Sequence, residues 1–198
     1  MAEITVDRSK VRQYSDEAQR YYGVSQVVDM ACGPLSYSNQ SAMDRGTGLH
    51  RLFAWDLAVH AGWAAAEQMP LIPEEYAGYV QSWRHWIKIA TPLVVHVEES
   101  FVSPDVHLPY AGTPDCVCFM KDKNREALTV VDLKTGSADR RHHLQVQAYG
   151  ALVPDAKREA LLYVDRNGGL PTWEVVQRDK RDLAAFHHAL NLLVWRER

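Results

Sequence analysis

The chain has 198 residues, of which 46% are hydrophobic and 24% charged, and its formal net charge is −3. These values suit one globular domain with a full hydrophobic core, and they argue against a strongly basic nucleic-acid coat protein, although not against an enzyme with a local basic groove. Three cysteines are too few and too odd in number for a disulfide framework. We expect all of them to be small buried hydrophobic residues: Cys32, Cys116 and Cys118.

The sequence gives no sign of membrane insertion or export. No apolar run approaches the roughly 20 residues that a membrane-spanning helix needs. The opening MAEITVDRSK is polar and lacks the apolar core of a signal peptide. We therefore expect no membrane association and a cytoplasmic location, which would be the host cytoplasm for a phage-encoded protein.

The pattern of apolar residues predicts helices first, then strands, then a mixture. Residues 7–29 are expected to be helical or mixed, and Gly33-Pro34 breaks that segment. Apolar spacings of three and four predict two helices, Met43 to Glu67 and Pro73 to Ala90. Strands are expected at 93–102, 113–120 and 127–134, with a loop at 103–112. A helix is expected at 137–153, followed by strands at 159–165 and 171–177. A closing helix is expected at 179–198, with Asp179 or Asp182 as its N-cap.

This order of elements predicts an α/β fold with a mixed central sheet flanked by helices. We expect a single domain over residues 1–198, divided into an N-terminal segment (1–42), a core (43–164) and a C-terminal strand and helix (165–198).

The stretch LTVVDLKTGS places an acid and an amine two residues apart in a strand. Strand side chains alternate, so Asp132 and Lys134 share one face. If the connection KDKNRE is a symmetric loop, Asp115 lies opposite Asp132 on the neighbouring strand, at a Cβ separation of roughly 5 Å. Two carboxylates at that distance require a shared proton or a cation, and oxygen ligands favour Mg²⁺ or Mn²⁺. A surface ion pair between Asp132 and Lys134 is the alternative explanation.

Four sequence pieces in order resemble the PD-(D/E)XK nuclease superfamily, and in particular its RecB-like branch. They are RGTGLH (45–50), GTPD (112–115), DLK (132–134) and QVQAYG (145–150), which look like that branch's G-x-x-x-H, D, D-x-K and Q-x-x-x-Y. The resemblance spans about Gly46 to Val164 and implies a restriction-endonuclease-like core of order αβββαβ. It is most similar to small stand-alone exonucleases of phages and genome maintenance.

The resemblance implies a role for each matched residue. It assigns His50, Asp115 and Asp132 as metal ligands, the Leu133 carbonyl as a backbone ligand, and Lys134 as the catalytic lysine. One or two Mg²⁺ or Mn²⁺ ions are the implied cofactor. From the residues alone, a histidine on an apolar helix face is more often a satisfied core residue, and it is the resemblance that implies a ligand role for His50.

Further residues are tied to the same site. Gln145 and Tyr149 lie four apart on one helix face, and the resemblance implies that they line the active site. A glutamate on the strand before the first aspartate is common in the branch, and alternation allows at most one of Glu98 and Glu99 to serve. The alternative for Gln145 and Tyr149, and for Glu98 and Glu99, is that they are solvent-exposed surface residues.

Basic side chains near the site are the candidates for phosphate contacts. Arg140 and Arg141 lie between the D-x-K strand and the following helix, whose N-terminus also attracts phosphate. Arg45 is close in sequence to His50. RDKR (178–181) and KDKNR (121–125) are weaker candidates that also suit solvated turns.

Two other features are open to more than one reading. The aromatic side chains Tyr76, Trp83 and Trp86 suit either stacking on single-stranded bases or a place in the core. Four cysteines would be needed for an iron–sulfur cluster, so none is expected.

The function predicted from the sequence is metal-dependent hydrolysis of DNA. We expect an exonuclease that acts on DNA ends, including single-stranded ones, in recombination, repair or phage replication, with a recombination or single-strand-binding protein as a partner. The alternatives are a structure-specific flap endonuclease and a non-catalytic DNA-binding module on the same fold.

Overall fold

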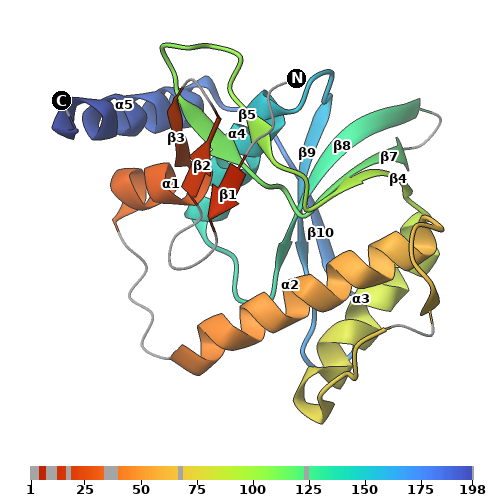
Figure 1. The fold of residues 1–198 in the computed structure, drawn as a ribbon. Helices are drawn as coiled ribbons and strands as arrows, with labels where there is room; N and C mark the ends of the chain where they lie inside the picture. Colours follow the sequence, from red (N-terminus) through yellow and green to blue (C-terminus); the bar gives the residue numbers. More distant parts are fainter. Residues whose placement is uncertain are drawn as a thin grey trace.

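The computed structural model describes residues 5–7, 13–16, 19–33, 40–66, 69–122 and 125–197. Its centre is a sheet with the strand order β10-β9-β8-β7-β4 (Figure 1). Strands β8 and β9 run parallel and the other neighbours antiparallel, so the sheet is mixed, as predicted. The strands are β4 (Leu93–Val97), β7 (Cys116–Asp122), β8 (Arg125–Lys134), β9 (Arg158–Tyr163) and β10 (Thr172–Val176).

Helices cover both faces of this sheet. Alternation along β8 sends Val130 into one hydrophobic cluster and its neighbour Val131 into another. The cluster of Val130 is completed by α1, α4 and α5, and that of Val131 by α2 and α3, which lie together on one side of the strands in Figure 1. Within the described ranges, no helix is both long and apolar enough to cross a bilayer. The helices are α1 (Val24–Cys32), α2 (Gln40–His60), the short 3-10 turn η2 (Glu74–Tyr76), α3 (Ala77–Ala90), α4 (Arg140–Leu152) and α5 (Lys180–Arg196).

A second, smaller sheet was not predicted. Its strand order is β1-β2-β3-β6-β5, and β3 pairs with β6 in parallel. The segment at residues 7–29, predicted as helical or mixed, holds two of the short strands and the first part of α1, and the expected loop at 103–112 contains β6. The strands are β1 (Thr5–Asp7), β2 (Gln13–Ser15), β3 (Arg20–Gly23), β5 (Phe101–Val102) and β6 (Tyr110–Gly112).

The strand expected at 93–102 is in fact two strands in two different sheets. β4 belongs to the central sheet and β5 to the small one. The chain turns between them at Glu98, whose φ of 48° lies in the left-handed region that side chains other than glycine rarely adopt. This turn therefore joins the two sheets at a strained residue.

Several local predictions can be compared with the structure. Asp179 caps α5 by accepting a hydrogen bond from the Arg181 amide, as predicted. Trp83 and Trp86 are buried, which confirms the core reading of these aromatic residues. Cys116 and Cys118 are buried as expected, whereas Cys32, at the end of α1, is exposed and that prediction was wrong.

Gly150 in α4 is expected to tolerate no side chain. A Cβ atom there would lie 2.6 Å from Cδ of Glu159, a buried carboxylate held by the Arg178 guanidinium. Gly150→Ala should therefore lower the free energy of unfolding by about 1–3 kcal/mol, measured by urea denaturation. Gly46→Ala is the matched control, because an added Cβ in α2 meets nothing within 4 Å. Equal effects of the two substitutions would contradict this account.

Candidate functional site

The β7–β8 hairpin has the register that the symmetric loop predicts. Cys116 pairs with Val131, and one more step in the same register sets Asp115 opposite Asp132. Alternation places both carboxylates and Lys134 on the face of the sheet that α4 covers.

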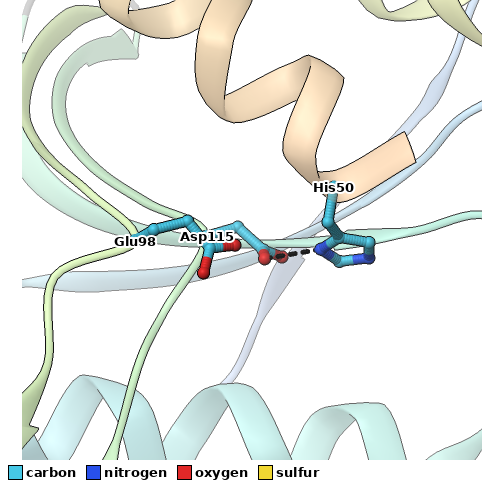
Figure 2. Close-up of side chains that lie close together, drawn as sticks. All are labelled: His50, Glu98 and Asp115. Atoms are coloured by element: carbon cyan, nitrogen blue, oxygen red, sulfur yellow. Dashed lines mark hydrogen bonds and ion pairs between the residues drawn. The ribbon is translucent and has the colours of Figure 1, made fainter. Parts of the chain in front are cut away.

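Three potential metal ligands meet at the edge of the sheet. One ligand atom from each of His50, Glu98 and Asp115 lies within 4.8 Å of the other two. They come from α2, from the turn after β4 and from the residue before β7 (Figure 2). His50 Nδ1 lies 2.7 Å from Asp115 Oδ1, and the Leu133 amide donates a hydrogen bond of 2.7 Å to Asp115 Oδ2. We call these three side chains the triad.

Two residues of the triad form a partly buried ion pair. Burial alone would raise the pKa of Asp115, but the His50 imidazole and the Leu133 amide outweigh it and hold that pKa well below its usual range. Burial would lower the pKa of His50, yet the Asp115 carboxylate raises it above its ordinary value. The two groups thus form a charged pair in which protons and a metal ion would compete for the same atoms.

Lys134 is held directly beside the second carboxylate. Its Nζ lies 2.6 Å from Asp132 Oδ2 and donates a hydrogen bond of 2.9 Å to Gln145 Oε1. The direction of the ion pair leaves the buried Asp132 Oδ2 without a well-aligned hydrogen-bond donor. Burial and then the Asp115 charge raise the pKa of Asp132, although Lys134 opposes this. The Lys134 ammonium is thus the charge that balances this buried carboxylate.

The two α4 residues suggested by the Q-x-x-x-Y pattern do lie at this site. Gln145 Nε2 donates a hydrogen bond of 3.0 Å to the Tyr149 hydroxyl, while its oxygen accepts from Lys134. Tyr149 is buried, and burial raises the pKa of its phenol well above the ordinary value of 10. Tyr149 therefore remains a neutral anchor that orients Gln145 and, through it, the lysine.

One of the two candidate glutamates joins the triad, although both lie in the turn after β4, where strand alternation does not apply. Glu98 contributes to it, whereas Glu99 pairs with His96 Nδ1 at 2.5 Å. Asp132 is not one of the three triad residues. Leu133 contacts the triad through its backbone amide, which donates a hydrogen bond to Asp115. The roles of Asp132 and of the Leu133 carbonyl as ligands stay predictions.

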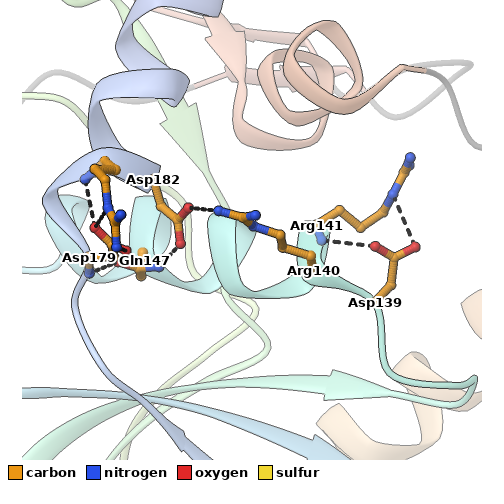
Figure 3. Close-up of polar contacts among 7 residues, drawn as sticks. Asp139, Arg140, Arg141, Gln147, Asp179 and Asp182 are labelled. Carbon is orange, nitrogen blue, oxygen red and sulfur yellow. Dashed lines mark hydrogen bonds and ion pairs between the residues drawn. The ribbon is translucent and has the colours of Figure 1, made fainter.

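The arginines proposed for phosphate contact are engaged within the protein. Arg140, whose side chain is 85% exposed, pairs with Asp182 at 3.2 Å (Figure 3). Arg141 is only 12% exposed and contacts Asp29 and Asp139. Arg45 lies over the Tyr79 ring, 6.0 Å from its centroid. Contact with DNA would require these pairs to open, so all three assignments stay predictions.

Sequence reasoning missed a histidine beside the lysine. His142 lies one turn before Gln145 on the same face of α4, and its Nδ1 is 3.3 Å from the Tyr163 hydroxyl. Tyr163 pairs with Lys134 across β8 and β9. Helical spacing from Gln145 is the signal that would have found His142.

Stability is expected to fall on the acid side through His142. Burial, helped by the Lys134 charge, lowers the pKa of His142 from 6.5 to about 4. Between these values the unfolded chain binds a proton that the folded chain does not, so stability is lost as pH falls from 6.5 towards 4. The loss should be on the order of 1 kcal/mol for this partly exposed ring. Urea unfolding at pH 7 and 5 should show a smaller loss for His142→Gln, and an identical loss would contradict this expectation.

The donor set could hold a metal ion. It offers one imidazole and two carboxylates, whereas Cys116 and Cys118 point into the core on the other face of the sheet. Among the described residues, the triad is the group of at least three such side chains close enough to hold an ion.

Comparison with known proteins gives a result for the fold. No family model and no curated protein matches the sequence. The crystal structure of LHK-Exo in complex with dAMP gives a TM-score of 0.50 at 10% identity and covers 89% of this chain and 87% of that chain. The chain has a PD-(D/E)XK-like fold.

Two further solved structures are similar. An alkaline exonuclease (LHK-Exo) from Laribacter hongkongensis gives a TM-score of 0.49 at 12% identity and covers 89% of this chain and 87% of that chain. The crystal structure of SSO0001 gives 0.44 at 12% identity, with coverage of 87% and 76%.

Proposed function

We propose that this protein is a metal-dependent deoxyribonuclease that degrades DNA from its ends. The observation that carries the proposal is the position of the triad beside a lysine that is held by both Asp132 and Gln145. A surface ion pair would not need a buried carboxylate, a second anchor for the lysine, or a cluster of metal-type donors next to it.

The residues divide the work of phosphodiester hydrolysis between them. His50, Glu98 and Asp115 would hold the ion, with Asp132 as a further ligand. When bound, a divalent ion polarises the scissile phosphate and lowers the pKa of water. Lys134 offers a fixed positive charge to the negative charge that develops on the phosphate, and it needs no reorientation because Asp132 and Gln145 already hold it.

The preference for DNA ends is supported by the name of a structural neighbour. LHK-Exo, which shares the fold, is described as an alkaline exonuclease. Flap endonuclease activity would use the same residues. A non-catalytic DNA-binding module on the same fold is the second alternative. Recombination, repair or phage replication are the settings we propose, with a single-strand-binding or recombination protein as partner.

The test is digestion of end-labelled linear, circular and flapped DNA with Mg²⁺ or Mn²⁺. Loss of linear DNA that spares circles, stops with EDTA and is absent in Asp132→Ala supports the exonuclease. Release of a flap from a circular substrate supports the endonuclease instead. Shifted but intact DNA under every condition would support the binding module.

A further inference from the structure

Two hydrogen bonds connect the small sheet to the segments that carry the triad carboxylates. The Tyr14 hydroxyl, on β2, lies 3.0 Å from Thr113 Oγ1, and Thr113 Oγ1 lies 2.9 Å from Ser100 Oγ. Thr113 is two residues before Asp115, and Ser100 is two residues after Glu98. The three hydroxyls therefore connect β2 to the segment that carries Asp115 and to the segment that carries Glu98.

This connection is buried at Tyr14 and Thr113. Tyr14 and Thr113 are each 3% exposed, so water does not replace a lost partner freely. Thr113 Oγ1 can donate one hydrogen bond and accept two, so it can bond the Tyr14 and Ser100 hydroxyls at the same time. Loss of either end leaves a buried polar group with an unused bonding position.

The β4–β7 and β5–β6 pairings join the two carboxylate segments on either side of the triad, and between these pairings lies a strained residue. The Glu98 amide donates a backbone hydrogen bond of 3.2 Å to the Asp115 carbonyl. Glu98 itself has the left-handed φ of 48°. Such a conformation persists only where the surroundings fix it. The contact from Ser100 to Thr113 supplies a second fixed link across the same turn.

The small sheet also braces the lysine side of the site. Gly112, the last residue of β6, packs so closely on Tyr149 that an added Cβ would lie 2.6 Å from the ring. Tyr149 in turn accepts the hydrogen bond from Gln145, which holds Lys134. The small sheet thus contacts Thr113, close to the triad residue Asp115, and also Tyr149, which orients Gln145 and Lys134.

We infer that Tyr14, Thr113 and Ser100 are positioning residues that set the separation of the Glu98 and Asp115 carboxylates for a divalent ion. The inference rests on the proposed function, since it takes the triad as the ion's site. It makes the N-terminal sheet part of the active centre, although Tyr14 itself contacts neither the ion nor DNA. A purely structural hydroxyl network would stabilise the fold without altering ion affinity.

The experiment is a calorimetric titration of Mn²⁺ into the full chain, carried out beside thermal unfolding of the metal-free protein. Tyr14→Phe should weaken Mn²⁺ binding about 10-fold, in the range seen when an outer partner of a metal ligand is lost. Cleavage should fall at low Mn²⁺ and recover with excess Mn²⁺. Tyr21→Phe is the matched control, because Tyr21 is a buried tyrosine of the same sheet whose hydroxyl bonds Asp16.

The outcomes separate this inference from the proposed function. Mn²⁺ affinity equal to wild type in Tyr14→Phe, or an equal loss in Tyr21→Phe, overturns the positioning role while the nuclease proposal stands. Wild-type protein that binds no Mn²⁺ overturns both. If Tyr14→Phe does not fold, Ser100→Ala tests the same link at a half-buried position. Ser103→Ala is its control, because that hydroxyl accepts a hydrogen bond from the Asp105 amide.

Discussion

Lys134→Ala is expected to slow DNA cleavage by about 100–1,000-fold, the typical effect of removing one preorganised charge stabiliser. The Nζ atom is fixed at 2.6 Å from Asp132 and 2.9 Å from Gln145, and the side chain is 14% exposed. It therefore meets the phosphate without the entropy cost of ordering a free lysine. DNA binding should change little, because one charge among several phosphate contacts is lost. Initial rates with Mg²⁺ and fluorescence anisotropy of labelled DNA in EDTA measure the two quantities.

The control for this variant is Lys157→Ala. It removes the same charge from an exposed lysine that is 3.8 Å from Asp155 and is not part of the site. Its cleavage rate should equal that of the wild type. Near-full activity of Lys134→Ala would remove the catalytic assignment, and a matched loss in Lys157→Ala would attribute the effect to net charge.

The hairpin that carries the site was predictable because its information is local. Alternation assigned Asp132 and Lys134 to one face, and the polar loop KDKNRE fixed the register that sets Asp115 opposite Asp132. A shift by one residue would have turned Asp132 and Lys134 to the opposite face of the sheet, against the cluster that holds Val131 and Leu133. His50 and Gln145 could not be placed beside the hairpin by such local rules, and only the family resemblance suggested it.

The small sheet was not predictable by the same reasoning. β2 and β3 are too short for alternation to be read, and β3 pairs with β6, about 90 residues further along the chain. Such a pairing leaves no local signature. The contacts of Tyr14 with Thr113, and of Gly112 with Tyr149, were hidden for the same reason.

The arginine assignments show a different limit of sequence reasoning. Position near a helix N-terminus suggested phosphate contact for Arg140 and Arg141. Their acidic partners, Asp182 and Asp29, lie 42 and 112 residues away in the chain. Only the tertiary structure reveals that these charges are already paired.

Asp115→Asn is expected to weaken Mn²⁺ binding by more than the about 10–100-fold that loss of an outer partner costs. Asp115 supplies a triad oxygen, and its charge also balances His50. An asparagine oxygen still accepts the Leu133 amide hydrogen bond, so the fold should persist while the charge is lost. Calorimetric titration of Mn²⁺ measures the affinity, and circular dichroism checks the fold.

The pH dependence of Mn²⁺ binding is a second test of the role of Asp115. Burial raises the pKa of Asp132 to about 6, and Asp115 raises that of His50, so protons compete with the ion as pH falls from 7 to 5. Wild-type affinity should therefore drop over this range, and the drop should be smaller in Asp115→Asn, where His50 has lost the carboxylate that holds its proton. Asp155→Asn, at a side chain that is 90% exposed, is the charge-matched control. Unchanged affinity in Asp115→Asn would exclude the triad as the metal site and leave Asp132 and Lys134 as a buried ion pair.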